Sequence, residues 1–283
     1  MTVQRVLRDT QSLPEVVFYV GTTPTDADAA VTVDILRGDG SIFATDAATT
    51  HVGGPPAGHY RYTLAPQANL ELFTLQWEGT FGGVVQRITS QVEVVGGYYV
   101  ALADIRALSG LADAAAFPNE KLAESRQWFE DKAESFCGVS FAPRYRRDVL
   151  DGGGSAGLQL MRGRPRRLLS VKIDGAVQTG LTTWDLYDDG TIVRDAGSFP
   201  SGRRNVEVIY EHGFDAPDSD MRQAALTAIR DNALGLASGI PPQATEVRQE
   251  FTTISLSVPG LNHPTGIPSV DAVLVDQRVP LVA

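Results

Sequence analysis

The chain has 283 residues, of which 43% are hydrophobic and 20% are charged, and its formal net charge is −10. This length exceeds the roughly 100–200 residues of a typical domain, so two domains are expected. The acidic balance argues against a general nucleic-acid binder. No apolar run approaches the ~20 residues of a transmembrane helix, and residues 1–9 lack the apolar stretch of a signal peptide.

The first 97 residues predict an all-β domain. Residues 30–36 alternate apolar and polar side chains and end at Gly38-Asp39-Gly40, which is a hairpin turn signal. A second hairpin is expected around Gly82-Gly83. Further strands are expected at residues 16–20, 41–43, 60–64, 72–77 and 84–95. Short strands separated by turn residues indicate an immunoglobulin-like β-sandwich, and Gly96-Gly97 marks its expected end.

Residues 98–283 predict a domain of the α+β class. Pro118 is expected to open a long helix that Gly138 ends, and Asp218 is expected to cap an alanine-rich helix. The expected helices span residues 102–108, 118–137, 221–236 and 269–277, and the expected strands include residues 149–150, 158–160, 168–173, 184–187, 191–193 and 206–210. We therefore expect a helical bundle with a β-hairpin insert.

The loop Gly152–Gly157 matches two functional patterns, G-x-G-x-x-G and, through Ser155, G-x-S-x-G. Both patterns need a helix directly after the loop, because the helix N-terminus binds the phosphate or presents the serine. Residues 158–165 instead predict a short strand broken by glycine and proline. We expect a glycine-rich hairpin tip with Ser155 in solvent. A hydrolase that uses Ser155 remains an alternative, which a substitution by alanine tests.

The sequence predicts no metal site, no cofactor and no enzyme activity. The histidines form no pair at helical ligand spacing, and no H-E-x-x-H or C-x-x-C motif is present. They are His51, His59, His212 and His263. Asp26-Ala27-Asp28 lacks the glycine and the distal glutamate of a calcium loop. The single cysteine, Cys137, excludes an intrachain disulfide, fits a reducing cytosol and is expected in the core.

Residues 142–172 form a basic segment with eight basic and two acidic residues. Seven arginines flank the glycine loop on what we expect to be one hairpin: Arg144, Arg146, Arg147, Arg162, Arg164, Arg166 and Arg167. Three interpretations remain open. The charges can discourage edge pairing of a solvated hairpin, or they can dock an acidic partner through bidentate contacts. The third, DNA threading past this surface, is weaker because tight phosphate binding would oppose passage.

Several local patterns in residues 98–283 carry a resemblance. Phe141-Ala142-Pro143-Arg144 follows the helical start, and Val206–Tyr210 leads through Gly213 and Pro217-Asp218 into the alanine-rich helix. In these patterns and in the order of elements, the segment resembles the head-to-tail adaptor (head-completion, connector) family of long-tailed phages. The ending Gly266–Leu274 resembles adaptors of phages that infect actinobacteria.

The resemblance implies a structural protein of the virion neck, made in the host cytoplasm. It implies a homo-oligomeric ring, dodecameric in that family, which lies under the portal, joins capsid to tail and receives the next neck or tail-completion protein. Double-stranded DNA would pass through the lumen during genome packaging and ejection without specific binding, and no membrane partner is implied. The resemblance makes the C-terminal residues Val270, Val273, Leu274 and Val279 candidate portal contacts. It also implies that the hairpin of residues 144–167, with its seven arginines, projects to a neighbouring subunit or into the lumen.

The family core does not require a β-sandwich before the adaptor domain, so residues 1–97 depart from its simplest pattern. These residues resemble the immunoglobulin-like modules that phages add to virion proteins. An alternative function is a tail or baseplate protein whose sandwich binds the host surface. That alternative predicts an exposed aromatic platform from residues such as Trp77, Tyr60 and Tyr62, although the alternation places some of them in the core.

Overall fold

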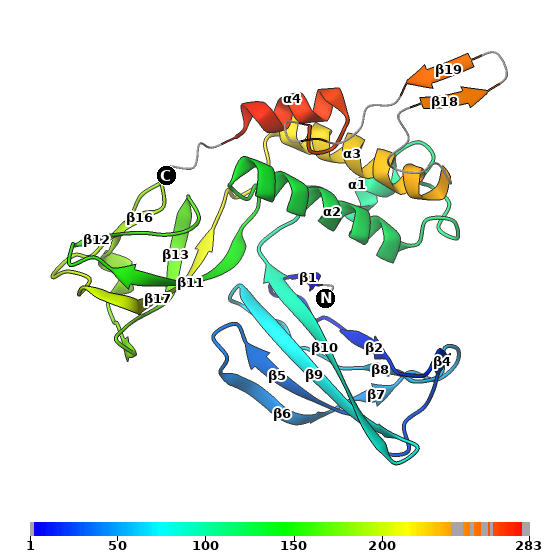
Figure 1. Ribbon diagram of the computed structural model, residues 1–283, viewed down its shortest axis with the longest axis horizontal. Helices are drawn as coiled ribbons and strands as arrows, with labels where there is room; N and C mark the ends of the chain where they lie inside the picture. The colour runs from blue at the N-terminus through cyan, green and yellow to red at the C-terminus, as the bar shows by residue number, and fades with distance from the viewer. Residues whose placement is uncertain (1–2, 239–245, 250–251, 256–259, 261–262, 279–283) are drawn as a thin grey trace.

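The computed structural model describes residues 3–238, 246–249, 252–255, 260 and 263–278, and it combines a large β-rich part with a smaller helical part (Figure 1). Strands occupy the first 95 residues. Helices then alternate with a second group of strands, which is inserted between α2 and α3. The predicted order of a β-rich region followed by helices with an inserted β region is therefore confirmed.

Ten strands form the N-terminal region as two facing sheets and a short ribbon. The strands are β1 (Val3–Leu7), β2 (Glu15–Val17), β3 (Tyr19–Val20), β4 (Thr23–Pro24), β5 (Thr32–Arg37), β6 (Ile42–Ala48), β7 (Thr50–His51), β8 (His59–Arg61), β9 (Glu71–Phe81) and β10 (Val84–Val95). One sheet has the order β1-β10-β9-β5-β6, the second has the order β2-β8-β7, and β3 pairs with β4. The hairpins predicted at Gly38–Gly40 and Gly82-Gly83 are both present.

The two N-terminal sheets enclose one hydrophobic core. The inward face of β5 supplies Val33 and Ile35, as the alternation predicts, and β9 supplies Trp77. Tyr145 and Ile209, which come from the second β region, complete this core. Because this core contains side chains from both the N-terminal and the inserted β region, the domain boundary expected at residue 97 stays a prediction.

The inserted β region is larger than the predicted hairpin. Its elements are β11 (Arg144–Gly152), β12 (Gly157–Gln159), β13 (Pro165–Ile173), β14 (Ala176–Val177), the 3-10 turn η1 (Leu181–Thr183), β15 (Asp185–Leu186), β16 (Thr191–Val193) and β17 (Gly202–His212). They form a sheet of order β11-β17-β13-β14 and a second sheet of order β12-β16-β15. β11 and β13 pair with opposite edges of β17, because this long and largely buried strand offers both edges for hydrogen bonding.

Four helices pack together beside the inserted sheets (Figure 1). They are α1 (Leu102–Arg106), α2 (Asn119–Cys137), α3 (Ser219–Ser238) and α4 (Pro268–Asp276), and a hairpin of β18 (Glu246–Gln249) and β19 (Thr252–Ser255) lies between α3 and α4. Gly138 ends α2 in the left-handed conformation, with φ of 75°. The Asp218 carboxylate accepts the backbone N–H of Met221 at 2.8 Å and so caps α3. Both predicted helix ends are confirmed.

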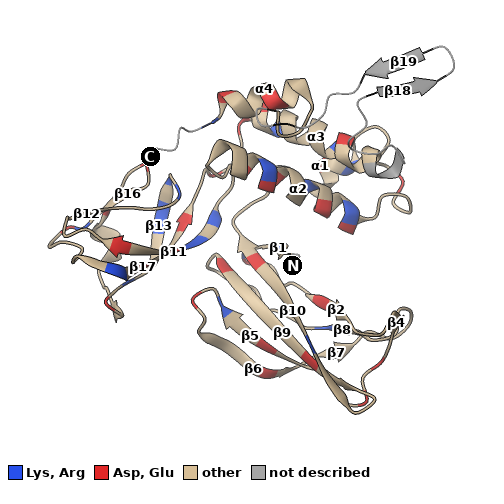
Figure 2. Cartoon of the chain, viewed as in Figure 1, with Lys and Arg blue, Asp and Glu red and all other residues tan. Residues whose placement is uncertain are grey.

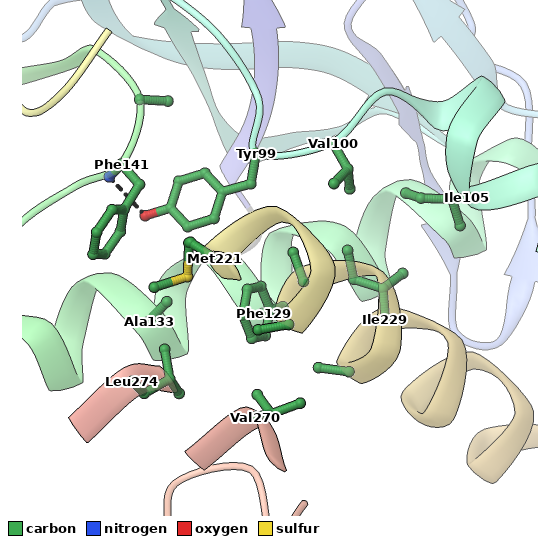
Figure 3. Close-up of a cluster of buried hydrophobic side chains, with 14 of the residues drawn as sticks. Tyr99, Val100, Ile105, Phe129, Ala133, Phe141, Met221, Ile229, Val270 and Leu274 are labelled. Atoms are coloured by element: carbon green, nitrogen blue, oxygen red, sulfur yellow. Dashed lines mark hydrogen bonds between the residues drawn. The ribbon is translucent and has the colours of Figure 1, made fainter. Parts of the chain in front are cut away.

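The helical core connects all four helices to the segment that enters β11. Phe129 of α2, Ile229 of α3 and Leu274 of α4 are fully buried in it (Figure 3). The backbone N–H of Phe141 donates to the hydroxyl of Tyr99 at 3.0 Å, which fixes the chain just before β11. Within the described residues, no helix is long and apolar enough to span a membrane.

Candidate functional site

The arginine-rich segment is not one hairpin, so that expectation is wrong. β11 and β13 run along the two sides of β17, and both Arg144 and Pro165 lie in register with His212. The glycine loop leads from β11 into β12, which belongs to the other sheet. The first residues of β11 and β13 therefore lie on either side of the end of β17. The seven arginines lie there on β11, on β13 and in the loop that enters β13, rather than along one turn.

Most arginines of this segment have partners within the chain. Figure 2 shows basic and acidic segments close together on these strands. The ion pairs are Arg146 with Asp148, Arg147 with Glu207, Arg164 with Asp188, Arg166 with Asp215, and Arg167 with Glu211. Arg162 contacts the carbonyl oxygen of Gly138 at 3.5 Å, and the Arg164 guanidinium also lies 4.0 Å from the centre of the Phe214 ring. The positive charge of the segment is thus largely balanced locally.

Arg144 differs from the other six because its side chain is buried, with 2% exposed. Its Nη2 donates to Glu130 at 2.8 Å and its Nε donates to Glu134 at 2.9 Å. Its Nη1 donates to the carbonyl oxygen of Gly97 at 2.8 Å. These bonds engage all three nitrogens of the planar guanidinium. Arg144 therefore links β11 to α2, and its contact with a partner stays a prediction.

Arg5 of β1 extends this buried network into the N-terminal region. Its guanidinium donates to Glu93 at 2.9 Å, to Glu130 at 3.0 Å and to Asp131 at 2.7 Å. The fully buried Glu130 carboxylate thus lies between Arg5 and Arg144, and its second oxygen accepts the backbone N–H of Tyr99 at 2.9 Å. The network joins β1, β10, α2 and β11, and all of its charged groups except the half-exposed Asp131 carboxylate have little access to water.

Each charge of this network depends on its neighbours. Burial acts to raise the pKa of Glu134, but Arg144 and Arg5 outweigh burial and hold that pKa below its ordinary value. For Glu130 burial prevails and raises the pKa, although the same two arginines oppose the change. Removing one partner from a buried ion pair leaves an uncompensated charge, which costs far more than losing an exposed pair. The network therefore stabilises the packing of the N-terminal strands and β11 against α2.

His212, next to Arg144 in the sheet, predicts an acid-sensitive stability. Burial, reinforced by Arg162, Arg146 and Arg144, lowers its pKa to about 4, although Glu134 acts the other way. Between pH 6.5 and 4 the unfolded chain then binds more protons at this residue than the folded chain. His212 is thus expected to lower the free energy of unfolding by about 3 kcal/mol as the pH falls through this window.

The measurement is urea denaturation of the wild type and of His212→Gln at several pH values. Other groups also titrate below pH 6.5, so the quantity of interest is the difference between the two proteins. The wild type is expected to lose about 3 kcal/mol more than the variant between pH 7 and pH 4. Parallel pH profiles for the two proteins would show that His212 titrates alike in the folded and unfolded chains.

The structure places the C-terminal candidates mainly inside the helical core. Val270 and Leu274 are buried there, and Val273 is partly buried against it. Val279 lies outside the described residues. Among the valine and leucine side chains of α4, Val275 is the exposed one, at 52%. Contact with a portal through Val270, Val273, Leu274 and Val279 stays a prediction.

The other candidate residues have ordinary structural surroundings. No helix follows the glycine loop, and Ser155 donates its hydroxyl to the carbonyl oxygen of Gly157 at 2.6 Å. No group of three or more potential metal ligands occurs in the part of the chain that the structure describes. Cys137 is buried, as predicted, and burial raises the pKa of its thiol to about 12.

Arg203 and Arg204 are surface residues that the sequence analysis did not single out. Both are exposed, and Arg204 has a positive φ of 50°. They lie outside the basic segment in the sequence, and no local motif marks them. The available signal was the pair of consecutive arginines between Gly202 and Asn205, just before the strand predicted at residues 206–210.

The chain is similar to a chain from the virion of a native gene transfer agent particle, with a TM-score of 0.45 and 15% sequence identity. That match covers 65% of this chain and 92% of the virion chain. Neither a protein-family model nor a curated protein matches the sequence.

Proposed function

We propose that the chain is a structural protein of a tailed-phage virion, namely a head-to-tail adaptor of the neck. Copies of the chain form a ring, dodecameric as in the adaptor family, between the portal and the next neck or tail-completion protein. The ring extends the channel through which double-stranded DNA passes. The function is binding and assembly, and no residue is assigned a catalytic role.

The join between β17 and α3 supports this proposal most directly, since it carries the resemblance to the adaptor family. β17 ends at His212, Gly213 turns the chain with φ of 101°, and Asp218 caps α3. The join sets the inserted sheet beside the helical core, and the backbone N–H of Phe214 donates to the carbonyl oxygen of Ser140 at 2.9 Å. This order of two helices, a β insert and two helices is the layout on which the resemblance rests.

The N-terminal sandwich is proposed to be an immunoglobulin-like addition that is fixed to the adaptor part. The Arg5 ion pairs and the packing of Tyr145 into the sandwich core support a rigid attachment. A rigid attachment gives the sandwich a constant position in each subunit of the ring. Its own partner in the virion is left open by the proposal.

Immunogold electron microscopy tests the proposed location. Tailed virions that contain the chain are labelled with an antibody against it, and gold is expected at the neck between capsid and tail. Gold distributed over the capsid, or no label on any virion, would contradict the neck assignment. An antibody against a known tail-tip protein of the same virion provides the positional control.

The alternative of a host-binding tail protein has less support. It predicts an exposed aromatic platform on the sandwich, but Trp77 is fully buried and Tyr60 is 5% exposed. Tyr62 is partly buried against the same core. Gold at the tail tip in the same experiment would nevertheless favour this alternative over the adaptor.

A further inference from the structure

The start of β17 contains a bulge that is built by specific side chains. Leu150 of β11 pairs with Val206, and Gly152 pairs with Gly202, so Asp151 stands opposite the three residues Arg203, Arg204 and Asn205. A bulge of this kind locally bends a strand and redirects side chains. Here it directs two consecutive arginines to the surface.

Hydrogen bonds and close packing hold the bulge in place. The Asn205 side chain accepts the N–H of Gly152 at 2.8 Å and donates to the carbonyl oxygen of Pro200 at 3.0 Å. The Asp151 carboxylate accepts the N–H of Arg204 at 2.6 Å. A Cβ at Gly152 would overlap the Pro200 carbonyl oxygen, so this turn needs glycine. The positive φ of Arg204 is thus imposed by its surroundings, and such conformations concentrate at functional positions.

The two arginines lack the internal partners that most other arginines have. Among the described residues, no carboxylate lies within ion-pair distance of the guanidinium of Arg203 or of Arg204. By contrast, Arg147 on the neighbouring strand is paired with Glu207. Two adjacent exposed guanidinium groups on a fixed bulge therefore form a ready contact for carboxylates of a partner.

A complementary pair of carboxylates lies at the beginning of α2. Glu120 and Glu124 are exposed, one helical turn apart, and no described cation is within ion-pair distance of either. Like charges at this spacing destabilise a helix slightly, which a bound cation relieves. Both line a groove of about 280 Å³ whose wall includes Val3 and Tyr98. Arg5 and Arg126 also line it, but Arg5 is paired with Glu130, and Arg126 lies over the Tyr98 ring. The groove thus combines two unpaired carboxylates with apolar surface.

The two features lie toward opposite ends of the molecule. In Figure 1 the sheet that contains β17 is at the left, while α2 begins at the right, along the longest axis. A contact between different surfaces of identical subunits is head-to-tail and closes into a ring when the rotation permits. Consecutive Cα atoms lie about 3.8 Å apart and Cβ atoms at positions i and i+4 about 6 Å apart, so two arginines can each reach one glutamate.

We propose that Arg203 and Arg204 of one copy bind Glu120 and Glu124 of the next copy, so that the bulge docks at the groove beside α2. This inference deepens the proposed function, since it rests on the ring and assigns one of its contacts. The net charge of −10 favours a docking element that is locally basic, because the rest of each neighbouring copy is predominantly acidic. The ion pairs set the orientation of the contact, and closure of the ring adds avidity.

Charge exchange in the full-length chain tests this contact. Self-association is measured by sedimentation velocity at low salt for three variants: Arg203→Glu with Arg204→Glu, Glu120→Arg with Glu124→Arg, and all four substitutions together. Each two-residue variant is expected to raise the dissociation constant about 10- to 100-fold, because like charges then face each other. The four-residue variant is expected to restore association to near the wild-type level.

A matched control distinguishes this contact from a general effect of net charge. Arg61→Glu with Arg87→Glu changes the net charge of the chain equally on the sandwich, where the Arg87 side chain is exposed and the Arg61 side chain is partly exposed. This variant should leave association near wild type. Failure of the four-residue variant to restore association, equal weakening by this control, or a wild type that stays monomeric at low salt and high concentration would each overturn the contact. Loss of duplex-DNA retention in Arg203→Glu with Arg204→Glu, with self-association unchanged, would assign the bulge to nucleic acid instead.

The proposed location and the proposed contact can fail separately. Gold at the neck with no rescue by charge exchange retains the adaptor function and rejects this contact. Rescue by charge exchange with gold at the tail tip retains the contact between copies and rejects the neck location. The virion experiment does not depend on Arg203 or Arg204.

Discussion

Replacing Arg144 with methionine is expected to lower the free energy of unfolding by about 3–5 kcal/mol. The substitution keeps an apolar chain of similar length but leaves the Glu130 carboxylate buried, with only Arg5 opposite its charge. Glu134 also loses its bond from the Arg144 Nε at 2.9 Å. Chemical denaturation measures the loss, with an unchanged m-value showing that stability rather than the unfolded state has changed.

The exposed pair between Arg87 and Glu78 provides a matched control. The Arg87 side chain is 76% exposed, so Arg87→Met is expected to cost less than about 1 kcal/mol. The double variant Arg144→Met with Glu130→Gln should cost less than the sum of its two single variants, because the second substitution removes the charge that the first leaves unpaired. Equal losses for Arg144→Met and Arg87→Met would contradict a buried, mutually dependent network.

The sequence predicts those elements whose signals are local. Helix α2 ends where Gly138 provides a left-handed residue, and β5 turns back at Gly38-Asp39-Gly40, because a turn or cap depends on a few neighbouring residues. The same residues show the limit of such signals. Gly38 also leaves space for the ring of Tyr145, where a Cβ would overlap the hydroxyl, and nothing near Gly38 in the sequence indicates that contact.

The sequence predicts which arginines belong to the candidate site, but it does not predict which residues they pair with or which strands carry them side by side. The basic segment is evident from its arginines, yet their partners come from residues far along the chain. Arg144 and Arg5 meet at Glu130, which is separated from Arg5 by 125 positions. Likewise, the arginine-rich residues of β11 and β13 suggest one hairpin because they flank the same glycine loop in the sequence, whereas both strands pair with β17. Long-range pairing depends on the whole core, so local patterns do not specify it.

Gly213→Ala is expected to lower the free energy of unfolding by about 3–5 kcal/mol, from the sum of backbone strain and overpacking. Gly213 has φ of 101°, which a residue with a Cβ rarely adopts. The added Cβ would also lie 2.7 Å from the carbonyl oxygen of Ala142 and 2.8 Å from that of Ser140. Both obstacles are backbone atoms of the segment that enters β11, so no side chain can move aside.

Gly175→Ala isolates the effect of strain from that of overlap. Gly175 also has a positive φ, of 78°, but a Cβ there would meet no atom within 4 Å. Gly175→Ala should therefore lower the free energy of unfolding only through backbone strain, by about 1 kcal/mol. Thermal or urea denaturation of the two variants gives the difference directly. A cost for Gly213→Ala no larger than for Gly175→Ala would mean that the join between β17 and α3 can shift away from Ser140 and Ala142. Gly213 would then have no role in fixing the inserted sheet against the helices.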